Sequence, residues 1–419
     1  MNVIADLHLH SKFARACSKD ITLQNLEKYA MMKGINLLGT GDFQHPKWIA
    51  ELKSQLNDDG KGILHTKTNY PFVLQTEISL IYSQDGKGRR VHNVVLAPNF
   101  ETANQIIEYL GKKGRLDYDG RPIFSIPCPQ FVDDLRKINK EIEIIPAHAW
   151  TPWFSVFGSK SGFNSLQECF LDQTKHIHAI ETGLSSDPSM NWRVSGLDNV
   201  ALISSSDSHS HWPWRIGREA TVFSMNDLSY SELIKSIREN KIAETLEFYP
   251  EEGKYHFDGH RACGVCLTPN ESIALKKICP TCKTELTIGV ANRVEELADK
   301  PEGRKPANAR PFRNLIPLSE IIAHVIHAPI ASKKVWEEYL KLIVAFGNEI
   351  AVLSASFDDL KKYTDERIAR AISHVDKVKW KPGFDGEYGV PLFEGKTATE
   401  FKPPKNSVLK STQRGLSEF

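Results

Sequence analysis

The stretch Asp6-Leu-His8-Leu-His10 follows the apolar residues 3–5, and together they predict a short buried strand near the start of the chain. Because side chains alternate across a strand, His8 and His10 are expected on the same side of its C-terminal end. Two imidazoles on one face provide half of a site for a divalent cation. An isolated His-x-His pair is equally compatible with two structural histidines, so the interpretation depends on the residues that follow.

The chain has 419 residues, enough for two or three domains with a large core. Lys and Arg (53) nearly balance Asp and Glu (52), so the bulk charge does not indicate a polyanion partner, and any nucleic-acid surface must be a local patch. The sequence has neither an apolar run of the ~20 residues that span a bilayer nor the pattern of a secretory signal. We therefore expect an intracellular protein, in the cytoplasm or nucleoid, with no membrane partner.

The residues after the first strand repeat its pattern. Residues 22–34 are predicted to form a helix with Thr22 as its cap and Gly34 as its stop, and residues 35–42 a second strand. Repetition of this unit builds a parallel sheet or barrel whose active groups lie at the C-terminal ends of the strands. Buried ionisable groups are costly unless they are paired or bind a metal, so a shared cation site explains their repetition better than core packing. The further predicted strands that carry or end in such groups are 72–77, 91–96, 142–148, 178–181 and 200–209.

These residues resemble the motifs of the PHP (polymerase and histidinol phosphatase) superfamily, metal-dependent phosphoesterases that fold as a distorted seven-unit β/α barrel. The four motifs correspond to Asp6-x-His8-x-His10, Thr40-Gly-Asp42, Pro146-Ala-His148 and Ser206-Asp207-Ser-His209. Glu77 falls where the superfamily has its bridging glutamate, and His92 where it has a histidine in the following strand. The resemblance implies an α/β fold and these metal ligands: His8, His10, Asp42, Glu77, His92, His148, Asp207 and His209.

The ligand set implies two or three clustered divalent ions, and all of the ligands except His92 are also the expected catalytic residues. Nitrogen and oxygen ligands together suit Zn²⁺ or Mn²⁺, and Mg²⁺ suits the oxygen-rich positions. Clustered cations lower the pKa of a bound water and hold the attacking and leaving oxygens of a phosphate. The expected reaction is therefore hydrolysis of a phosphate ester.

Two positions depart from the superfamily pattern. The second motif usually ends in histidine, where this chain has Asp42. The superfamily also often has an acid or histidine about five residues after the second histidine of the first motif, and this chain has Ala-Arg-Ala-Cys there, at residues 14–17. One of three metal positions is therefore expected to be weak or differently liganded. Arg15 is a candidate phosphate ligand because a guanidinium binds phosphate oxygens bidentately, and the alternative is a solvated side chain.

Aromatic residues lie beside two of the ligand strands, in Trp150-Thr-Pro-Trp153-Phe154 and in His211-Trp212-Pro-Trp214-Arg215. Their tryptophans are candidates to stack on an extruded base, and the alternative is packing on the barrel rim. Two short basic loops, Lys87-Gly-Arg89-Arg90 and Lys112-Lys113-Gly-Arg115, are either solvated or grip a nucleic-acid backbone. The barrel itself is expected to span residues 1–248.

Residues 249–290 carry two Cys-x-x-Cys pairs, Cys263-Gly-Val-Cys266 and Cys279-Pro-Thr-Cys282. Their spacing predicts one structural zinc ion held by four thiolates, and two redox or incidental pairs are the alternative. A segment this short has little core and depends on the metal to fold. His260 and Asp258 lie just upstream and are candidates to contact either the ligands or a partner, and the sequence does not decide between the two.

Residues 291–398 are predicted to form a small helical domain, with Ser319, Ser332 and Thr364 as helix caps. Its basic loops, 300–313 and 377–388, suit either contact with nucleic acid or an exposed linker. The order of barrel, four-cysteine module and helical domain with Phe-Asp-Gly-Glu-Tyr-Gly resembles the endonuclease Q family over about residues 1–390.

This second resemblance implies a DNA-repair endonuclease. Members of the family cut on the 5′ side of deaminated bases (uracil, hypoxanthine, xanthine) and of abasic sites, and leave 3′-hydroxyl and 5′-phosphate ends. Two alternatives stay open: a small-molecule phosphatase of the histidinol-phosphate kind, and a non-catalytic adaptor that binds damaged DNA.

Residues 399–419 are predicted to be a flexible tail that ends in Gln413-Arg-Gly-Leu416-Ser-Glu-Phe419. This sequence resembles the peptide by which repair proteins dock on a sliding clamp (PCNA), although it lacks the second terminal aromatic residue. In that mode Leu416 and Phe419 fill one apolar pocket of the clamp. The sliding clamp is therefore an expected partner beside DNA.

Overall fold

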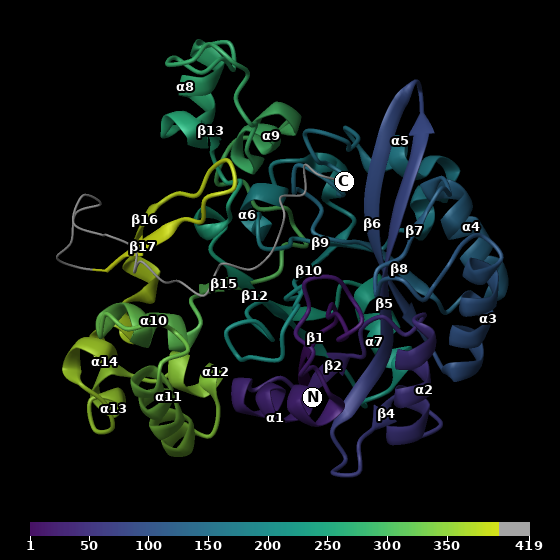
Figure 1. Cartoon of the computed structure of the whole chain (residues 1–419), viewed down its shortest axis with the longest axis horizontal. Coiled ribbons are helices and arrows are strands. Elements are labelled where there is room, and N and C mark those ends of the chain that lie inside the picture. Colours follow the sequence, from purple (N-terminus) through teal and green to yellow (C-terminus); the bar gives the residue numbers. More distant parts are fainter. Residues whose placement is uncertain (394–419) are drawn as a thin grey trace.

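The structure, a computed structural model, describes residues 1–393 and has an α/β body with two smaller parts beside it (Figure 1). The centre of its sheet is β1 (Asn2–Asp6), which runs parallel to β2 (Leu37–Gly39), and β2 runs parallel to β5 (Pro71–Gln84). On the other side β1 pairs antiparallel with β11 (Ala220–Ser224), and β11 with β12 (Ile242–Phe248). The expected α/β class is confirmed, and the sheet is mixed.

The far side of the sheet is a long antiparallel hairpin of β5 and β6 (Lys87–Ala97), and β6 pairs antiparallel with β8 (Glu143–Pro146). β9 (Ala179–Glu181) and β10 (Ala201–Ile203) form a parallel pair with each other. Two short strands pair with β5, β4 (Leu64–His65) and β7 (Ile123–Phe124), and β3 (Asn57–Asp58) pairs with β4.

Helices surround these strands, with α3 and α4 on the outer side of the β5–β6 hairpin (Figure 1). In the first helix, α1 (Leu23–Lys33), the Thr22 hydroxyl accepts a hydrogen bond from the backbone of Asn25, and Gly34 ends the helix with φ 100°. Both predicted ends of this helix are thereby confirmed. The others in this part are α2 (Pro46–Gln55), α3 (Phe100–Gly111), α4 (Cys128–Ile138), α5 (Leu166–Phe170), α6 (Pro188–Asn191) and α7 (Tyr230–Arg238).

The second part projects from the body at the top of Figure 1 and corresponds to the predicted zinc module. It contains the hairpin of β13 (Asp258–His260) and β14 (Val265–Leu267), followed by α8 (Pro269–Ala274) and α9 (Val290–Leu297). Thr268 and Glu271 form a reciprocal capping box that starts α8.

The third part is helical and has an apolar core of its own, which includes Ile321, Leu342 and Ile368. It is preceded by β15 (Phe312–Leu315), which pairs parallel with β12 and so extends the sheet of the body. The division at residues 248, 290 and 398 stays a prediction. Within the predicted helical segment, β15 forms the edge strand of the sheet of the body. The remaining elements are α10 (Leu318–Val325), α11 (Lys333–Phe346), α12 (Glu349–Leu353), α13 (Phe357–Leu360), α14 (Glu366–Ser373), β16 (Lys379–Lys381) and β17 (Val390–Leu392).

Short 3-10 helices connect several elements: Leu171–His176, Ser195–Leu197, Pro250–Glu252, Arg261–Cys263 and Val375–Lys377. Among the helices in residues 1–393, none combines the length and the apolar composition that crossing a bilayer requires. The predicted clamp-binding residues, Gln413, Leu416 and Phe419, lie outside the described residues.

Candidate metal centre

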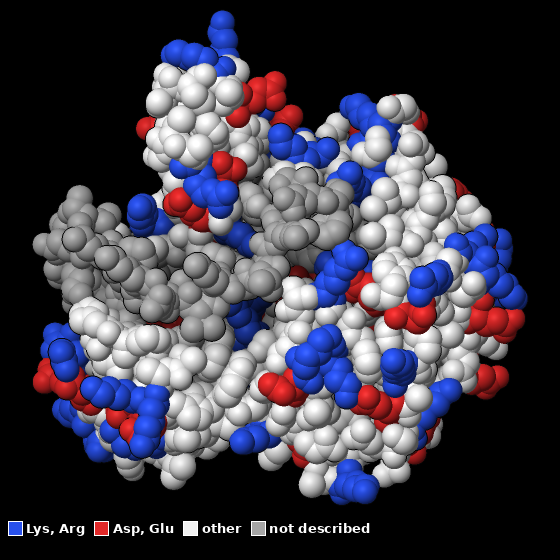
Figure 2. All heavy atoms as spheres, in the orientation of Figure 1, with Lys and Arg blue, Asp and Glu red and all other residues white. Residues whose placement is uncertain are grey.

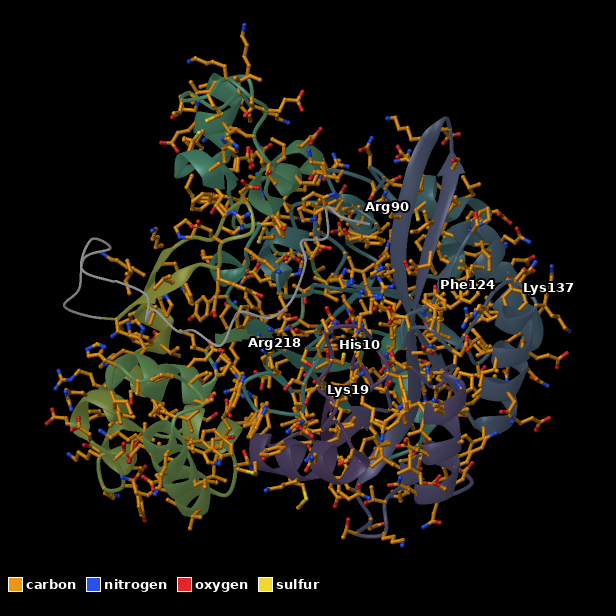
Figure 3. The ribbon with its side chains drawn as sticks, in the orientation of Figure 1. His10, Lys19, Arg90, Phe124, Lys137 and Arg218 are labelled. Atoms are coloured by element: carbon orange, nitrogen blue, oxygen red, sulfur yellow. The ribbon has the colours of Figure 1, made fainter. Side chains whose placement is uncertain are left out.

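Side chains from separate strand ends converge near the middle of the body, where Figure 3 labels His10. The ligand atoms within each of two groups lie within 4.8 Å of one another, and Glu77 belongs to both groups. The first group is His8, His10, Glu77 and Asp207, and the second is Glu77, His92 and His148. The structure thus brings together six of the eight residues that the sequence predicts as ligands.

Glu77, on β5, lies between the two groups. Its Oε2 atom is 3.2 Å from His10 Nε2 and 3.7 Å from His8 Nε2. Its Oε1 atom is 2.7 Å from His92 Nδ1 and 3.1 Å from His148 Nε2. One buried carboxylate therefore faces both sets of imidazoles, which is the geometry needed to bridge two cations.

Several atoms of the first group are buried without a hydrogen-bond partner among the described residues. They are His8 Nε2, His10 Nε2 and Asp207 Oδ1. Buried polar atoms without partners are costly, and a divalent cation between them would satisfy all three. The mixture of imidazole nitrogen and carboxylate oxygen fits Zn²⁺ or Mn²⁺.

Two carboxylates orient the imidazoles of the first group. Glu181, at the end of β9, lies with Oε2 2.9 Å from His8 Nδ1 and also accepts the backbone N–H of His148 at 3.1 Å. Asp42 Oδ1 lies 3.0 Å from His10 Nδ1. In both rings the carboxylate binds the Nδ1 side and leaves Nε2 for a metal, as in carboxylate–histidine–metal sites.

Asp42 and His209, both predicted ligands, lie outside the two groups. The oxygens of Asp42 are already engaged, because Oδ2 accepts the backbone N–H of Ser11 at 2.6 Å while Oδ1 faces His10. The His209 ring packs 4.5 Å from the His10 ring, centroid to centroid, and its Nδ1 lies 3.0 Å from the backbone oxygen of Asp207. Asp42 contacts a residue of the first group in this structure, and its own role as a ligand, like that of His209, stays a prediction.

Arg121 is a site residue that no sequence motif marks. It lies in the loop between α3 and β7, and its Nη1 atom donates to Glu77 Oε2 at 3.2 Å. Arg15, in contrast, is 60% exposed and its Nε lies 3.4 Å from Asp119 Oδ2, so its predicted phosphate contact stays a prediction. Glu181 was visible in the sequence only as an acid that ends a strand.

The backbone is strained where three of these residues leave their strands. Asp42, His148 and Asp207 have φ values of 39°, 32° and 45°. L-residues rarely adopt positive φ, which costs of order 1–3 kcal/mol, and such residues concentrate at functional sites. The surrounding fold stabilises these conformations and so aims the side chains at the cluster.

The cluster attracts positive charge. Burial alone would lower the pKa of His8, but the carboxylates of Glu181 and Glu77 raise it well above its usual value. The pKa of His10 is also raised against its burial, chiefly by Asp42. Burial would raise the pKa of Glu77, yet the imidazoles and the guanidinium around it hold it well below the usual range. A site with this potential favours divalent cations.

The predicted base-stacking tryptophans are largely engaged in packing. Trp150 is 1% exposed and its Nε1 donates to Asn191 at 2.7 Å, so it offers no face to a base. Trp212 and Trp214 stack on each other at 4.9 Å, and Trp336 of α11 packs edge-on against both. Trp153 packs against Tyr255 with ring centroids 5.3 Å apart. These contacts favour the rim-packing alternative for Trp150, Trp212 and Trp214.

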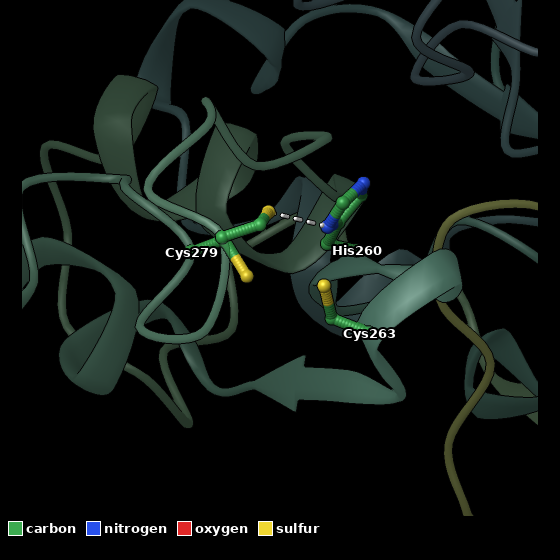
Figure 4. A group of neighbouring side chains, drawn as sticks. His260, Cys263 and Cys279 are labelled. Carbon is green, nitrogen blue, oxygen red and sulfur yellow. Dashed lines mark hydrogen bonds between the residues drawn. The ribbon is translucent and has the colours of Figure 1, made fainter.

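The projecting module holds a separate group of metal-binding atoms (Figure 4). Its ligand atoms lie within 4.8 Å of one another and come from His260, Cys263, Cys279 and Cys282. The sequence predicts Cys266 in place of His260, and the structure places Cys266 outside this group, so Cys266 as a zinc ligand stays a prediction. Across the β13–β14 hairpin Cys266 pairs with Gly259 and His260 with Val265, so alternation directs Cys266 and His260 to opposite faces. Three thiolates and one imidazole are also an established tetrahedral zinc set.

The fold and the shared carboxylate–imidazole cluster define a metal-dependent hydrolase of the phosphoesterase class. A family model described as the MJ0043 C-terminal domain matches residues 317–377, which contain α10 to α14. The uncharacterized protein YqxK of Bacillus subtilis (strain 168) is 30% identical over 412 residues, which cover 92% of this chain and 98% of YqxK. The uncharacterized protein MJ0043 of Methanocaldococcus jannaschii is 34% identical over 261 residues, 59% of this chain, and the match spans 32% of MJ0043.

Two solved structures match nearly the whole chain, each at 30% identity. The lesion-specific endonuclease PfuEndoQ of Pyrococcus furiosus has a TM-score of 0.84, with 93% of this chain and 95% of that chain covered. Endonuclease Q in complex with a 27-mer duplex substrate, with an abasic lesion at its active site, has a TM-score of 0.85 and coverages of 94% and 97%. The chain belongs to the endonuclease Q family.

Proposed function

We propose that the chain is a DNA-repair endonuclease that hydrolyses the phosphodiester on the 5′ side of deaminated bases (uracil, hypoxanthine, xanthine) and of abasic sites. The products are a 3′-hydroxyl and a 5′-phosphate. The observation that carries this proposal is Glu77 between two groups of imidazoles, in a fold that matches a solved family member bound to abasic DNA. Membership of this family favours the endonuclease over a small-molecule phosphatase and over a non-catalytic adaptor.

Each group of side chains around Glu77 would hold one divalent ion, which makes two ions the favoured number. Such ions supply an activated water and stabilise the charge that develops on a phosphate. Zn²⁺ or Mn²⁺ fits the imidazole-rich groups, and a separate structural Zn²⁺ fits the projecting module. With Asp42 engaged by Ser11 and His10, a third catalytic ion has less support.

The side chains around the cluster position the groups that react. Glu181 and Asp42 fix the His8 and His10 rings through their Nδ1 atoms, so both Nε2 atoms face the cluster. Arg121 places a guanidinium beside Glu77, where it can bind two oxygens of the scissile phosphate and offset the charge of the transition state. Burial of the cluster excludes competing water and strengthens these interactions.

Cleavage of labelled duplexes tests this proposal. Oligonucleotides with uracil, hypoxanthine, xanthine or an abasic site are incubated with the protein, with and without a chelator, and the ends of the products are mapped. We expect lesion-dependent incision that the chelator abolishes and that His8→Ala and Asp207→Ala reduce by at least about 100-fold. Lys137→Ala, an exposed residue on α4 (Figure 3), should cut like the wild type. Full activity in both ligand variants would contradict the assignment of the metal centre.

The same proposal places the protein inside the cell, where its DNA substrate is found. Binding of a sliding clamp through Gln413, Leu416 and Phe419 stays a prediction from sequence.

A further inference from the structure

Residues 158–162, Gly-Ser-Lys-Ser-Gly, form a tight loop that the proposed reaction does not use. The backbone N–H of Gly162 donates to the oxygen of Gly158 at 2.9 Å, and a side chain at Gly162 would meet Gly158 backbone atoms at 2.4 Å and 2.7 Å. Only glycine fits there, so the loop closes on itself. The backbone N–H groups of Ser159 and Ser161 make no hydrogen bond within residues 1–393.

This loop lines a polar pocket of about 520 Å³ between the β6 end of the hairpin and α9. The hydroxyl of Ser161 is buried and has no hydrogen-bond partner in the described part of the chain, and Ser161 itself is 8% exposed. Arg89, also a lining residue and 9% exposed, donates through Nη1 to the oxygen of Gly162, and its Nε has no partner among the described residues. An unpaired buried hydroxyl and guanidinium N–H beside a polar pocket require an acceptor that the described chain does not provide.

The charge of the pocket identifies the kind of acceptor. Lys87 and Lys160 line it, are exposed, and have no ion-pair partner among residues 1–393. Of its two glutamates, Glu296 pairs with Arg293 at 3.1 Å and Glu168 accepts the backbone N–H of Asn164 at 2.9 Å. The pocket therefore keeps free cations while its carboxylates are occupied. Figure 2 shows Lys and Arg side chains gathered around the gap between α9 and the hairpin.

The pocket is separate from the metal centre but connected to it through two segments. Arg89 precedes His92 by three residues on β6, which is about 10 Å along a strand, and the two side chains point to opposite faces. The segment 149–165, which contains the glycine loop, directly follows His148. A ligand in the pocket would therefore fix the loop that begins at a residue of the metal centre.

We propose that this pocket is a second phosphate site, which binds one phosphate group through the Ser161 hydroxyl, Lys87, Lys160 and the guanidinium of Arg89. Glycine loops with free N–H groups, hydroxyls and lysine are typical cradles for phosphate oxygens. If the proposed function holds, the phosphate belongs to the DNA backbone, because exposed lysines line the pocket and its glycine loop lies in the segment that follows His148. A free phosphate or small phosphorylated molecule is the other source of the same chemistry.

Titration with inorganic phosphate tests the site itself. Calorimetry on the full chain measures the binding, in a background with both His8→Ala and His148→Ala, which removes one side chain from each of the two ligand groups. We expect Ser161→Ala and the double change Lys87→Ala with Lys160→Ala each to weaken phosphate binding by about tenfold or more. Lys137→Ala serves as the matched lysine control and should bind like its parent. Unchanged phosphate affinity in both pocket variants, at unchanged melting temperature, would overturn the proposal.

A second experiment, which measures DNA binding, identifies the source of the phosphate. With uncleaved duplex, the double lysine variant should lower the slope of log Kd against log salt concentration by about one to two units if the DNA backbone enters the pocket. Loss of phosphate binding with unchanged DNA binding would assign the pocket to a free or small-molecule phosphate. The double lysine variant leaves the metal centre intact, so it should still incise DNA at low salt. Loss of phosphate binding with retained incision therefore concerns the pocket alone and leaves the proposed function untouched.

Discussion

At the scale of single residues, the metal centre depends on carboxylates that do not themselves belong to the ligand groups. Glu181 and Asp42 each engage the Nδ1 atom of one imidazole, and the sequence marked Asp42 as a ligand but Glu181 only as an acid that ends a strand. Strand ends with His, Asp or Glu could be found from the pattern, because ionisable residues after apolar runs are unusual. Arg121 could not be found, because it lies in a loop with no motif and reaches Glu77 only through the fold.

Replacing Glu181 by Gln should weaken metal binding without removing a ligand. The amide keeps the shape but loses the charge that orients His8, and loss of such a partner typically costs 10–100-fold in metal affinity. Calorimetric titration with Zn²⁺ or Mn²⁺ measures the change. Glu302→Gln, at an exposed position, is the matched control. Equal affinities of the two variants would show that Glu181 does not position the ligand.

Glu247 should make stability depend on pH. It is fully buried and accepts hydrogen bonds from Thr182 at 2.8 Å and Ser204 at 3.0 Å, and burial raises its pKa to about 8. In the unfolded chain this carboxyl has a pKa of about 4.3, so the folded state holds a proton that the unfolded state releases. Its contribution to stability is therefore complete below about pH 4.3 and is lost as the pH rises through about 8.

Glu247→Gln should remove this part of the pH dependence because the amide does not titrate. Between pH 5 and 8 the free energy of unfolding of the wild type should fall more steeply than that of the variant, by up to about 1.4 kcal/mol per pH unit. Urea unfolding at several pH values measures both slopes. Parallel curves would show that the carboxyl is not protonated in the folded protein.

At the scale of elements, local sequence signals predicted several helix ends, whereas pairings between strands far apart in sequence could not be predicted. Thr22 and Gly34 placed α1, and Ser332 placed α11, because caps act within one turn. Ser319 lies inside α10, which starts after Pro317, and α14 is capped by Asp365 instead of Thr364. The partner of β15 is a barrel strand far away in sequence, and no local pattern specifies such a pairing.

The zinc ligands are also hard to predict from sequence, because Cys-x-x-Cys spacing does not reveal on which face of a hairpin each side chain lies. His260→Ala should lower the zinc content per chain, whereas Cys266→Ser should retain it, since only His260 faces the three thiolates. Atomic absorption on purified variants and the rate of zinc release to a colorimetric chelator measure the difference. Zinc loss in Cys266→Ser with retention in His260→Ala would support the four-thiolate site predicted from the sequence.

At the scale of the whole molecule, the helical part is joined to the body by a buried ion pair and by aromatic packing. Lys33 of α1 is 2% exposed, and its Nζ lies 2.7 Å from Glu349 at the start of α12. Tyr339 donates to the other oxygen of Glu349 at 2.9 Å, and Trp336 packs against the tryptophans of the loop 211–215. The two parts are thus expected to hold a fixed orientation on one DNA duplex.

Glu349→Ala should both destabilise the protein and loosen this orientation, because it leaves the Lys33 ammonium buried without its carboxylate. Breaking one side of a buried pair typically costs about 3–5 kcal/mol. Chemical unfolding measures the loss, and limited proteolysis between β15 and α11 measures the loosening. Glu366→Ala removes the partner of Arg370 at an exposed pair of α14 and should change neither measurement appreciably. If both variants behaved alike, the ion pair would not hold the parts together, and the aromatic contacts of Trp336 would be the remaining connection to test.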